Sequence, residues 1–476
     1  MNKPITRLFV LVLAMFAALV AYTSRWTVFD ASALQNSNLN VRTLRETADI
    51  PRGPIYGAGD AELAFSRRTS SGYVRDYPFG TLFGQPIGYS IPIERRAAGL
   101  EAFRNHALTG TPLEHQSIFD QLAGHQSAGD AVDTTLDPAA QQVAMSDLQR
   151  ALRKGAVAGA VVAIVPSTGA IKVFASDPGL NPNAFVAGKP AGSQFDQAAE
   201  GGEFPGSAEK VVTAVAAIDS GKFTSQSVVN GNSPQSFFGI PLHNDGNTSY
   251  GPVNLENALT YSINTAWANV AQALGPAILQ KYMLRFGFYR KPPVDLPNAE
   301  LTASGVRDQK GRLLLPTSGD VDVPLVGIGE GQLQVTPLQM AMVAAAVANH
   351  GVLMRPHITA RIVNADGVVL QKIKPSVYSR VMMPSTAAAV TTMMRQVVKD
   401  GTAANALAGF SIDVAGKTGT AELANTANSP NDAWFIAFAP YRDIAVAVVV
   451  DHTYDYGADA AAPIARDVIQ SLVGSS

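Results

Sequence analysis

The 476-residue sequence contains no cysteine, which excludes a disulfide framework, a thiol nucleophile and thiolate metal ligands. Charged residues make up only 16% of the chain, and Lys+Arg 36 nearly balance Asp+Glu 38. The formal net charge of -2 excludes the basic surface that bulk nucleic-acid binding requires, so we expect no nucleic-acid partner. The hydrophobic fraction of 47% excludes a mostly disordered chain and predicts a sizeable packed core.

Three common catalytic patterns are also missing. The 7 histidines show no His-Glu-x-x-His spacing and no clear metal cluster, so we expect neither a metal nor a cofactor. No Gly-x-Ser-x-Gly elbow is present, which counts against an α/β-hydrolase. Gly416-Lys417-Thr418 ends like a phosphate-binding loop, but Ser411 occupies the position of that motif's first glycine, so the pattern fails.

The first 25 residues have the charge order of a signal sequence. Lys3 and Arg7 precede an almost wholly apolar run from Leu8 to Tyr22, and the next charge is Arg25. This order predicts a cytoplasmic N-terminus, one crossing of the cytoplasmic membrane and an extracytoplasmic remainder. The run lies at the border between a cleaved signal and a spanning helix, and no clean small-x-small cleavage site is present. We therefore favour an uncleaved signal anchor over a cleaved signal or a buried core helix.

Hydrophobic patterns divide the remaining chain into two units. Residues 26–150 carry frequent turn residues and short apolar stretches, which predict a small, β-rich, non-catalytic domain. Residues 151–476 begin and end with strand-like runs and are mainly helical between them, which predicts an α+β domain whose sheet is completed by both ends. We expect strands at 158–165, 170–175, 433–438 and 444–450, and helices at 137–152 and 460–473.

The segment from Phe204 to Lys210 is the first that carries chemistry. Pro205 and Gly206 predict a turn before an apolar-faced helix, so Ser207 lies at or near the first helical turn and Lys210 shares its face. A serine hydroxyl becomes a nucleophile when a base takes its proton, and a desolvated lysine can be that base. Free N–H groups at the helix start can also bind an oxyanion. An N-cap serine followed by a solvated lysine explains the same pattern.

Two later segments carry polar residues that suit the same cleft. Ser262 and Asn264 lie in residues 254–274, a stretch of helical character, and can present a hydroxyl and an amide, although helix capping explains them equally. Lys417 lies in Ala415-Gly-Lys-Thr-Gly-Thr420, which follows a strand-like alternation, and would be a positive charge beside the cleft. Gly419 in the same segment would let another backbone approach closely.

The order Ser-x-x-Lys, Ser-x-Asn and Lys-Thr-Gly is the motif set of penicillin-binding proteins and β-lactamases. With these motifs, the chain resembles the class B penicillin-binding proteins over nearly its whole length. The resemblance implies a penicilloyl-serine-transferase (β-lactamase-like) fold, with an antiparallel five-stranded sheet between an all-helical lobe and flanking helices. Further matching segments are Arg52-Gly53-Pro54-Ile55, Asp133-Thr-Thr-Leu-Asp137, Gln141-Gln142, Gly327-Ile-Gly329, Gln334-Val-Thr-Pro-Leu-Gln339 and Trp434.

The resemblance also implies a peptidoglycan D,D-transpeptidase of cell-wall synthesis, acting in cell division or cell shape. Its implied substrates are peptidoglycan stem peptides, β-lactam antibiotics would stop at the acyl-enzyme, and a membrane-embedded glycan polymerase is the implied partner of the anchor and small domain. The implied roles are nucleophile for Ser207, proton acceptor for Lys210, proton relay for Ser262, positioning for Asn264, carboxylate binding for Lys417, Thr418 and Thr420 in the strand that includes Gly419, and an oxyanion hole from the N–H groups of Ser207 and Thr420.

Two other functions use the same residues. A D,D-carboxypeptidase or β-lactamase passes the acyl group to water, and a β-lactam sensor or divisome scaffold binds without turnover.

The sequence departs from the family at Glu209, where an aromatic residue is usual. Helical spacing turns Glu209 about 200° away from Ser207, and a carboxylate buried there would need a partner.

Overall fold

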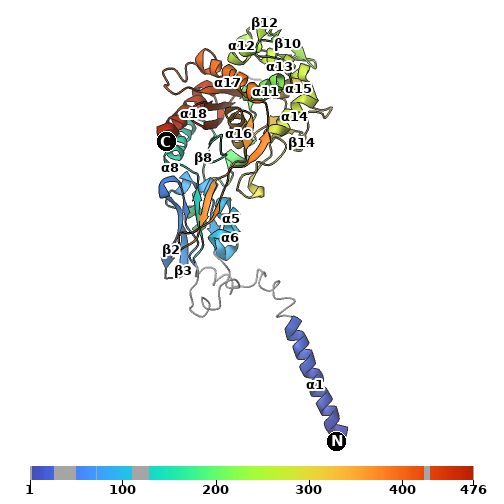
Figure 1. The fold of residues 1–476 in the computed structure, drawn as a ribbon, viewed down its shortest axis with the longest axis vertical. Coiled ribbons are helices and arrows are strands. Elements are labelled where there is room, and N and C mark those ends of the chain that lie inside the picture. The colour runs from blue at the N-terminus through green and yellow to red at the C-terminus, as the bar shows by residue number, and fades with distance from the viewer. Residues whose placement is uncertain (1–2, 26–49, 71, 110–127, 423–428, 475–476) are drawn as a thin grey trace.

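A five-stranded antiparallel sheet of order β20-β21-β22-β7-β8 lies at the centre of the structure, a computed structural model that describes residues 3–25, 50–70, 72–109, 128–422 and 429–474 (Figure 1). The strands are β7 (Ala158–Ile164), β8 (Ile171–Asp177), β20 (Ala415–Glu422), β21 (Asn431–Ala439) and β22 (Ile444–Thr453). Because β22 pairs with β7, the late strands complete a sheet that the early ones begin, which confirms the predicted fold class.

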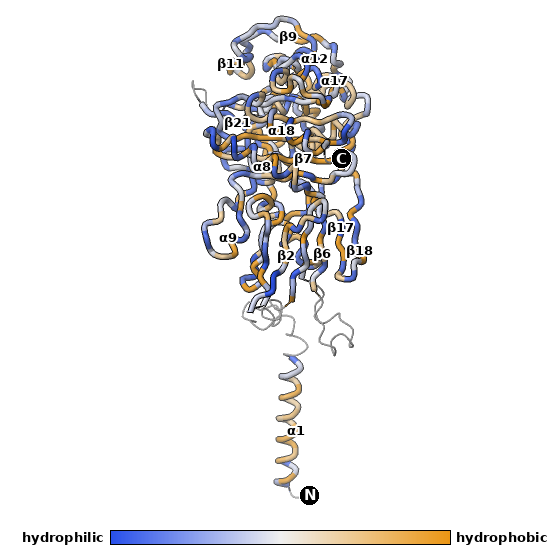
Figure 2. The backbone as a smooth tube through the Cα atoms, turned by 90° about the vertical axis from the view of Figure 1, so that its left-hand side faces the viewer, coloured by the Kyte–Doolittle hydropathy of each residue, from blue (hydrophilic) through white to orange (hydrophobic). Residues whose placement is uncertain are grey.

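Helices cover both faces of this sheet. One face carries α8 (Pro138–Arg153) and α18 (Gly457–Gly474), which also pack on each other, and the other carries α16 (Pro337–Ala348). Every residue of β7 and β21 is buried as a result. The double cover explains why these strands are continuous apolar runs and do not alternate with polar residues. Figure 2 shows the hydrophobic colour concentrated in this layer.

A helical lobe packs against the β20 side of the sheet (Figure 1). Its members are η6 (Gly206–Glu209), α11 (Lys210–Asp219), α12 (Leu255–Thr260), α13 (Asn264–Leu274), α14 (Pro276–Phe286), α15 (Val323–Val326) and α17 (Pro384–Lys399). The predicted helical stretch 254–274 is two helices, because the chain turns at Ser262. The structure also contains small sheets of two or three strands. They are β4–β5 (Ser90–Ile91, Arg96–Ala97), β9–β12 (Val228–Asn230, Pro252–Asn254), β10–β11 (Gln235–Phe237, Ile240–Leu242), β13 with β14 and β15 (Gly305–Arg307, Leu313–Leu314, Leu333–Gln334) and β16–β19 (Val352–Met354, Val377–Arg380).

The small unit contains a second sheet, of order β18-β17-β6-β1-β2-β3. Its strands are β1 (Ile55–Tyr56), β2 (Glu62–Thr69), β3 (Gly72–Asp76), β6 (Ala131–Thr134), β17 (Thr359–Val363) and β18 (Val369–Lys372), and short helices α4 (Gly84–Ile87), α5 (Gly99–Phe103) and α6 (Asn105–Leu108) lie beside them. The hairpin β17–β18 comes from far downstream and pairs antiparallel with β6. The sequence did not predict this pairing, because nothing local in residues 359–372 specifies it.

The two units are therefore interleaved along the chain. Helix α8, which lies mostly before residue 150, packs on the central sheet, whereas β17 and β18 belong to the small sheet. Asp295 reinforces the junction, since its carboxylate accepts the N–H groups of Ile358 and Thr359 at 2.5 and 2.7 Å and lies 3.5 Å from Arg104 Nη2. No single cut between residues 150 and 151 reproduces this arrangement.

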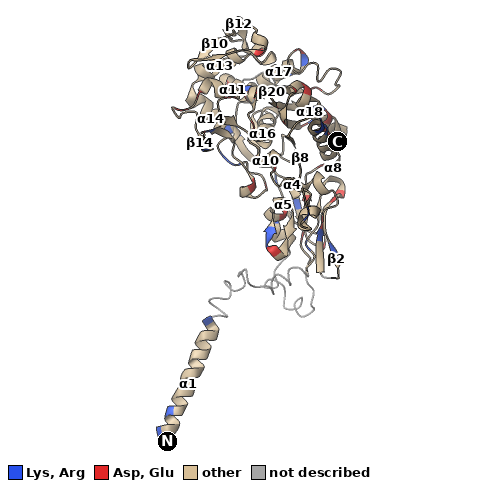
Figure 3. Cartoon of the chain, turned by 180° about the vertical axis from the view of Figure 1, so that it is seen from behind, with Lys and Arg blue, Asp and Glu red and all other residues tan. Residues whose placement is uncertain are grey.

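Helix α1 (Lys3–Ser24) is the N-terminal element, and it is long and apolar enough to cross a membrane, with a mean hydropathy of 2.2 and no buried residue. Figure 2 shows that most of its residues are hydrophobic. Its charged residues, Lys3 and Arg7, lie near its N-terminal end, and Arg25 follows its last residue, so the middle of the helix carries no charge (Figure 3).

Arg52, the first residue of a family motif, has a structural partner in the small unit. Glu101 is 0% exposed, and its two oxygens accept hydrogen bonds from Arg52 Nε and Arg75 Nε at 2.5 Å each. The two guanidinium groups outweigh the cost of burial and lower the pKa of Glu101. This triad stabilises the small unit only while all three charges are present.

We expect Glu101→Gln to lower the free energy of unfolding by about 3 kcal/mol, because two buried guanidinium groups lose their counter-charge. Urea unfolding of the full-length chain, followed by circular dichroism, measures the loss. The control is Glu94→Gln, which removes an ion pair with Arg96 whose side chains are both about half exposed, 52% and 51%, and should change nothing measurable. Equal losses in both variants would contradict the assignment.

Candidate active site

Ser207 lies in η6, the 3₁₀ turn that leads directly into α11. The preceding residue, Gly206, has φ +50°, and a Cβ there would come within 2.6 Å of Thr420 O. Glycine is therefore required for this turn to pack against β20. The Gly206 N–H also donates to Gly329 O at 3.1 Å, so the turn is held from two sides.

Lys210 begins α11 and is 0% exposed. Its Nζ lies 2.8 Å from Ser207 Oγ and 2.6 Å from Asn264 Oδ1, and it donates to Ser262 O at 2.8 Å. Burial lowers the pKa of Lys210 to about 7. A large fraction of this amine is thus unprotonated near neutral pH and can take the proton of a neighbouring hydroxyl.

The turn between α12 and α13 presents Ser262 and Asn264 to Lys210. Ser262 has φ +57°, a left-handed conformation that residues with a side chain rarely adopt. The Asn264 Nδ2 group donates to His243 O at 3.1 Å, which fixes the amide so that Oδ1 faces the lysine. A backbone conformation of this kind is typical of functional sites, where the surrounding structure enforces it.

Lys417 reaches the same turn from the sheet. It lies on β20, is 0% exposed, and donates to Ser262 Oγ and Thr418 O at 2.9 Å each. The Ser262 hydroxyl also lies 3.3 Å from Lys210 Nζ. The two lysines therefore share one hydroxyl, and the three motifs meet at one point.

The rest of the Lys-Thr-Gly-Thr segment packs beside the Ser207 turn and the start of α18. Thr418 Oγ1 lies 2.6 Å from Thr402 Oγ1, and Thr420 Oγ1 accepts the first N–H of α18 at 3.2 Å. A Cβ at Gly419 would meet Pro205 O at 2.5 Å. The glycine thus allows the close approach of β20 to the Ser207 turn.

The two lysines have different electrostatic surroundings. Burial lowers the pKa of Lys417 well below its usual range, and the neighbouring charge of Lys210 lowers it further. Glu330 and Asp245 instead favour the charged form of Lys210, although burial has the larger effect. Two ammonium groups cannot both persist in this buried space, so an arriving anion would stabilise the cation at Lys417.

Glu209 is buried, but its two carboxylate oxygens have no hydrogen-bond partner among the described residues. The partner that a buried carboxylate would need is thus missing in this part of the chain, and burial raises the pKa of Glu209 well above its usual range. Burial therefore favours the neutral form of this acid.

Sequence models of known families match both units. The penicillin-binding protein transpeptidase domain matches residues 159–470, which include all three motifs. The chain belongs to the penicillin-binding protein transpeptidases. The dimerisation domain of penicillin-binding protein A matches residues 52–132, in the small unit.

Full-length relatives agree with this membership. The peptidoglycan D,D-transpeptidase PbpA of Mycolicibacterium smegmatis is 30% identical, and the alignment covers 99% of each chain. PbpA of Mycobacterium tuberculosis is 29% identical over the same shares. Among solved structures, penicillin-binding protein A of M. tuberculosis as a ceftriaxone acyl-enzyme complex has a TM-score of 0.79 at 27% identity, covering 90% of this chain and 99% of that one. A D,D-transpeptidase domain from Eggerthella lenta has a TM-score of 0.76 at 29% identity, with the same coverage.

Sequence motifs did not reveal every contact of the transpeptidase site. His243 and Thr402 lie in loops. His243 accepts a hydrogen bond from Asn264, and Thr402 shares a hydrogen bond with Thr418. His243 contributes only its backbone carbonyl, which every residue type has, so the sequence gives no signal for this contact. Thr402 follows Gly401 after α17 and has no spacing relation to the Lys-Thr-Gly motif, so no signal could have singled it out.

We expect Glu209→Gln to stabilise the transpeptidase increasingly as pH rises. The folded protein keeps the Glu209 proton at pH values where the unfolded chain has lost it, above the ordinary pKa of 4.5. Its contribution to stability is therefore complete below that pH and is lost with rising pH, by about 1.4 kcal/mol per pH unit, until the folded pKa is reached. Glutamine stays neutral, so the unfolding free energies of the two proteins should diverge as the pH rises above 4.5. Parallel curves would show that Glu209 is ionised in the folded protein.

Proposed function

We propose that Ser207 is the nucleophile through which this peptidoglycan D,D-transpeptidase cross-links stem peptides. The supporting observation is the 2.8 Å separation of Ser207 Oγ from Nζ of the buried Lys210. Ser207 Oγ bonds to the carbonyl carbon of the penultimate D-Ala, and its proton passes to the neutral amine of Lys210. The C–N bond then breaks, and terminal D-Ala leaves with a proton.

Ser262 lies on the proposed path of the proton, next to both lysines. Its hydroxyl lies 3.3 Å from Lys210 Nζ and 2.9 Å from Lys417 Nζ. In our proposal Ser262 relays the proton from Lys210 to the leaving amine, and Asn264 holds Lys210 and the substrate amide in place. The amine of a second stem peptide then attacks the acyl-enzyme, which forms the cross-link and frees Ser207.

The substrate's terminal carboxylate supplies a negative partner for the buried ammonium group of Lys417. We assign its binding to Lys417, Thr418 and Thr420, in the strand whose Gly419 packs against the Ser207 turn. Carboxylate binding raises the pKa of Lys417, and the resulting cation helps to keep Lys210 neutral. Substrate binding and activation of the base are therefore coupled in this mechanism.

The backbone N–H groups of Ser207 and Thr420 complete the proposed site as the oxyanion hole. The turn and the strand that carry them are in contact, since a Cβ at Gly206 would touch Thr420 O. One such donor typically lowers the barrier by about 3 kcal/mol. β-Lactams react at the same serine and stop at the acyl-enzyme.

We also propose that α1 anchors the protein in the cytoplasmic membrane and that both folded units lie outside it. The apolar length of α1 and the basic residues before its apolar run support this topology. A membrane-embedded glycan polymerase is the partner we propose for α1 and the small unit, because the cross-linking reaction consumes newly made glycan strands.

We expect Ser207→Ala to abolish covalent labelling by a fluorescent penicillin and the cross-linking of stem peptides, because the change removes the hydroxyl that forms the acyl bond. The matched control is Ser220→Ala, which changes the serine that caps the C-terminal end of α11, and this variant should label normally. Rapid release of the label from the unaltered protein would instead indicate a β-lactamase. Stable labelling without cross-linking would indicate a sensor.

We expect the acylation rate to rise with pH through about 7, because Lys210 accepts the proton only in its neutral form. The rate constant of penicillin acylation, measured from pH 5.5 to 8, tests this. Replacing an exposed lysine, Lys281→Gln, should leave the profile unchanged. A rate that does not vary with pH would exclude Lys210 as the base.

A further inference from the structure

Two side chains of β21 bind the peptide groups on either side of Phe204, three residues before Ser207. The Phe204 N–H donates to Asp432 Oδ2 at 3.3 Å, and Trp434 Nε1 donates to Phe204 O at 2.9 Å. Asp432 is 2% exposed and Trp434 is 0% exposed. Residues 432 and 434 share a face of the strand, so one rigid element holds both peptide groups. We call this pair the Phe204 clamp.

The chain between the clamp and the nucleophile has little freedom. Pro205 has a φ fixed by its ring, and its carbonyl oxygen packs against Gly419. Gly206 is held by its bond to Gly329 and by its contact with Thr420. A displacement of Phe204 would therefore be passed on to Ser207.

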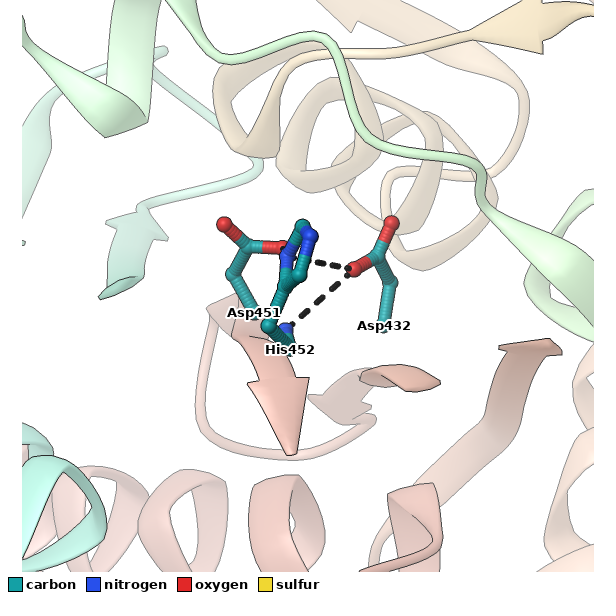
Figure 4. A group of neighbouring side chains, drawn as sticks. All are labelled: Asp432, Asp451 and His452. Carbon is teal, nitrogen blue, oxygen red and sulfur yellow. Dashed lines mark hydrogen bonds and ion pairs between the residues drawn. The ribbon is translucent and has the colours of Figure 1, made fainter. Parts of the chain in front are cut away.

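The Asp432 carboxyl is itself positioned by β22. The β21–β22 register shifts between Asn431 and Ala433, and Asp432 lies opposite Asp451 and His452 (Figure 4). The His452 N–H donates to Asp432 Oδ1 at 3.4 Å, and its ring Nδ1 lies 2.6 Å from Asp451 Oδ1 and 3.9 Å from Asp432 Oδ1. The imidazole thus lies between the two carboxyl groups.

The surroundings of Asp432 favour its protonated form. Burial, followed by the hydrogen bond and negative charge of Asp451, raises the pKa of Asp432 to about 8. Asp451 and His452 of β22 and the buried Glu203 face this group, and Glu422 of β20 lies across from its neighbour Asn431. Ionisation of Asp432 would place two carboxylates side by side and push them apart.

We propose that Asp432 and Trp434 are positioning residues that hold Phe204 and so set the distance between Ser207 Oγ and Lys210 Nζ. This inference rests on the proposed role of Ser207 as nucleophile. The clamp does not touch the reacting atoms. It acts on the acylation step and leaves the non-covalent binding of penicillin unchanged.

The test compares Trp434→Phe, Asp432→Ala and Asp432→Asn in the full-length protein. Stopped-flow measurements with a fluorescent penicillin separate the dissociation constant of the first complex from the acylation rate constant. We expect Trp434→Phe and Asp432→Ala to lower the rate constant about 10- to 100-fold, as small displacements of a nucleophile do, with the dissociation constant unchanged. Trp267→Phe is the matched control, because its buried indole N–H has no partner among the described residues, and it should keep the full rate.

The asparagine variant tests the protonation state of Asp432. Asparagine resembles the neutral acid, can accept the Phe204 N–H and cannot ionise. We therefore expect Asp432→Asn to react like the unaltered protein at pH 7 and to keep its rate at pH 9, where the unaltered protein slows.

Three results would overturn the inference. The first is a full acylation rate in Trp434→Phe, and the second is an equal loss of rate in Trp267→Phe. The third is a loss of rate in Asp432→Asn as large as in Asp432→Ala. If Asp432→Ala does not fold, Trp434→Phe and Asp432→Asn decide the question. Labelling that persists in Ser207→Ala would instead refute the assignment of the nucleophile, independently of the clamp variants.

Discussion

The close approach of two buried lysines is the constraint on which the site depends. Lys210 and Lys417 come from different parts of the fold and meet on either side of the Ser262 hydroxyl. A buried space without counter-ions cannot hold two ammonium groups. One amine must be neutral, and the carboxylates of Glu330 and Asp245 are too weak to reverse the effect of burial on Lys210. In the proposed mechanism the neutral amine is the base, and the carboxylate of the substrate supplies a negative charge.

The architecture brings these lysines together from two layers. Lys210 comes from the helical lobe, and Lys417 comes from the edge strand of the central sheet. Two glycines, Gly206 and Gly419, allow the layers to touch, because a side chain at either position would collide with backbone atoms of the other layer. The candidate site thus lies where the edge strand of the sheet meets the start of α11, beside the Ser207 turn.

The sequence predicted much of this arrangement and missed definable parts of it. Long apolar runs identified β7, β21 and β22, because a strand covered on both faces has no polar alternation. Helical periodicity placed Lys210 on the face of Ser207. The left-handed turn at Ser262 was not foreseen, because serine carries no signal for that conformation. Contacts made by backbone atoms, such as His243 O, and pairings between distant strands, such as β6 with β17, depend on tertiary structure that no local pattern encodes.

The β17–β18 hairpin has a consequence for how such proteins evolve. The six-stranded sheet of the small unit takes two of its strands from the downstream half of the gene, and Asp295 binds the first residue of β17 and the residue before it. A single recombination event at the apparent boundary would join a small unit to a foreign hairpin and leave an edge strand mispaired. Exchange of the complete small unit between relatives requires two additional breakpoints, one on each side of residues 359–372. We therefore expect the two units to be inherited together.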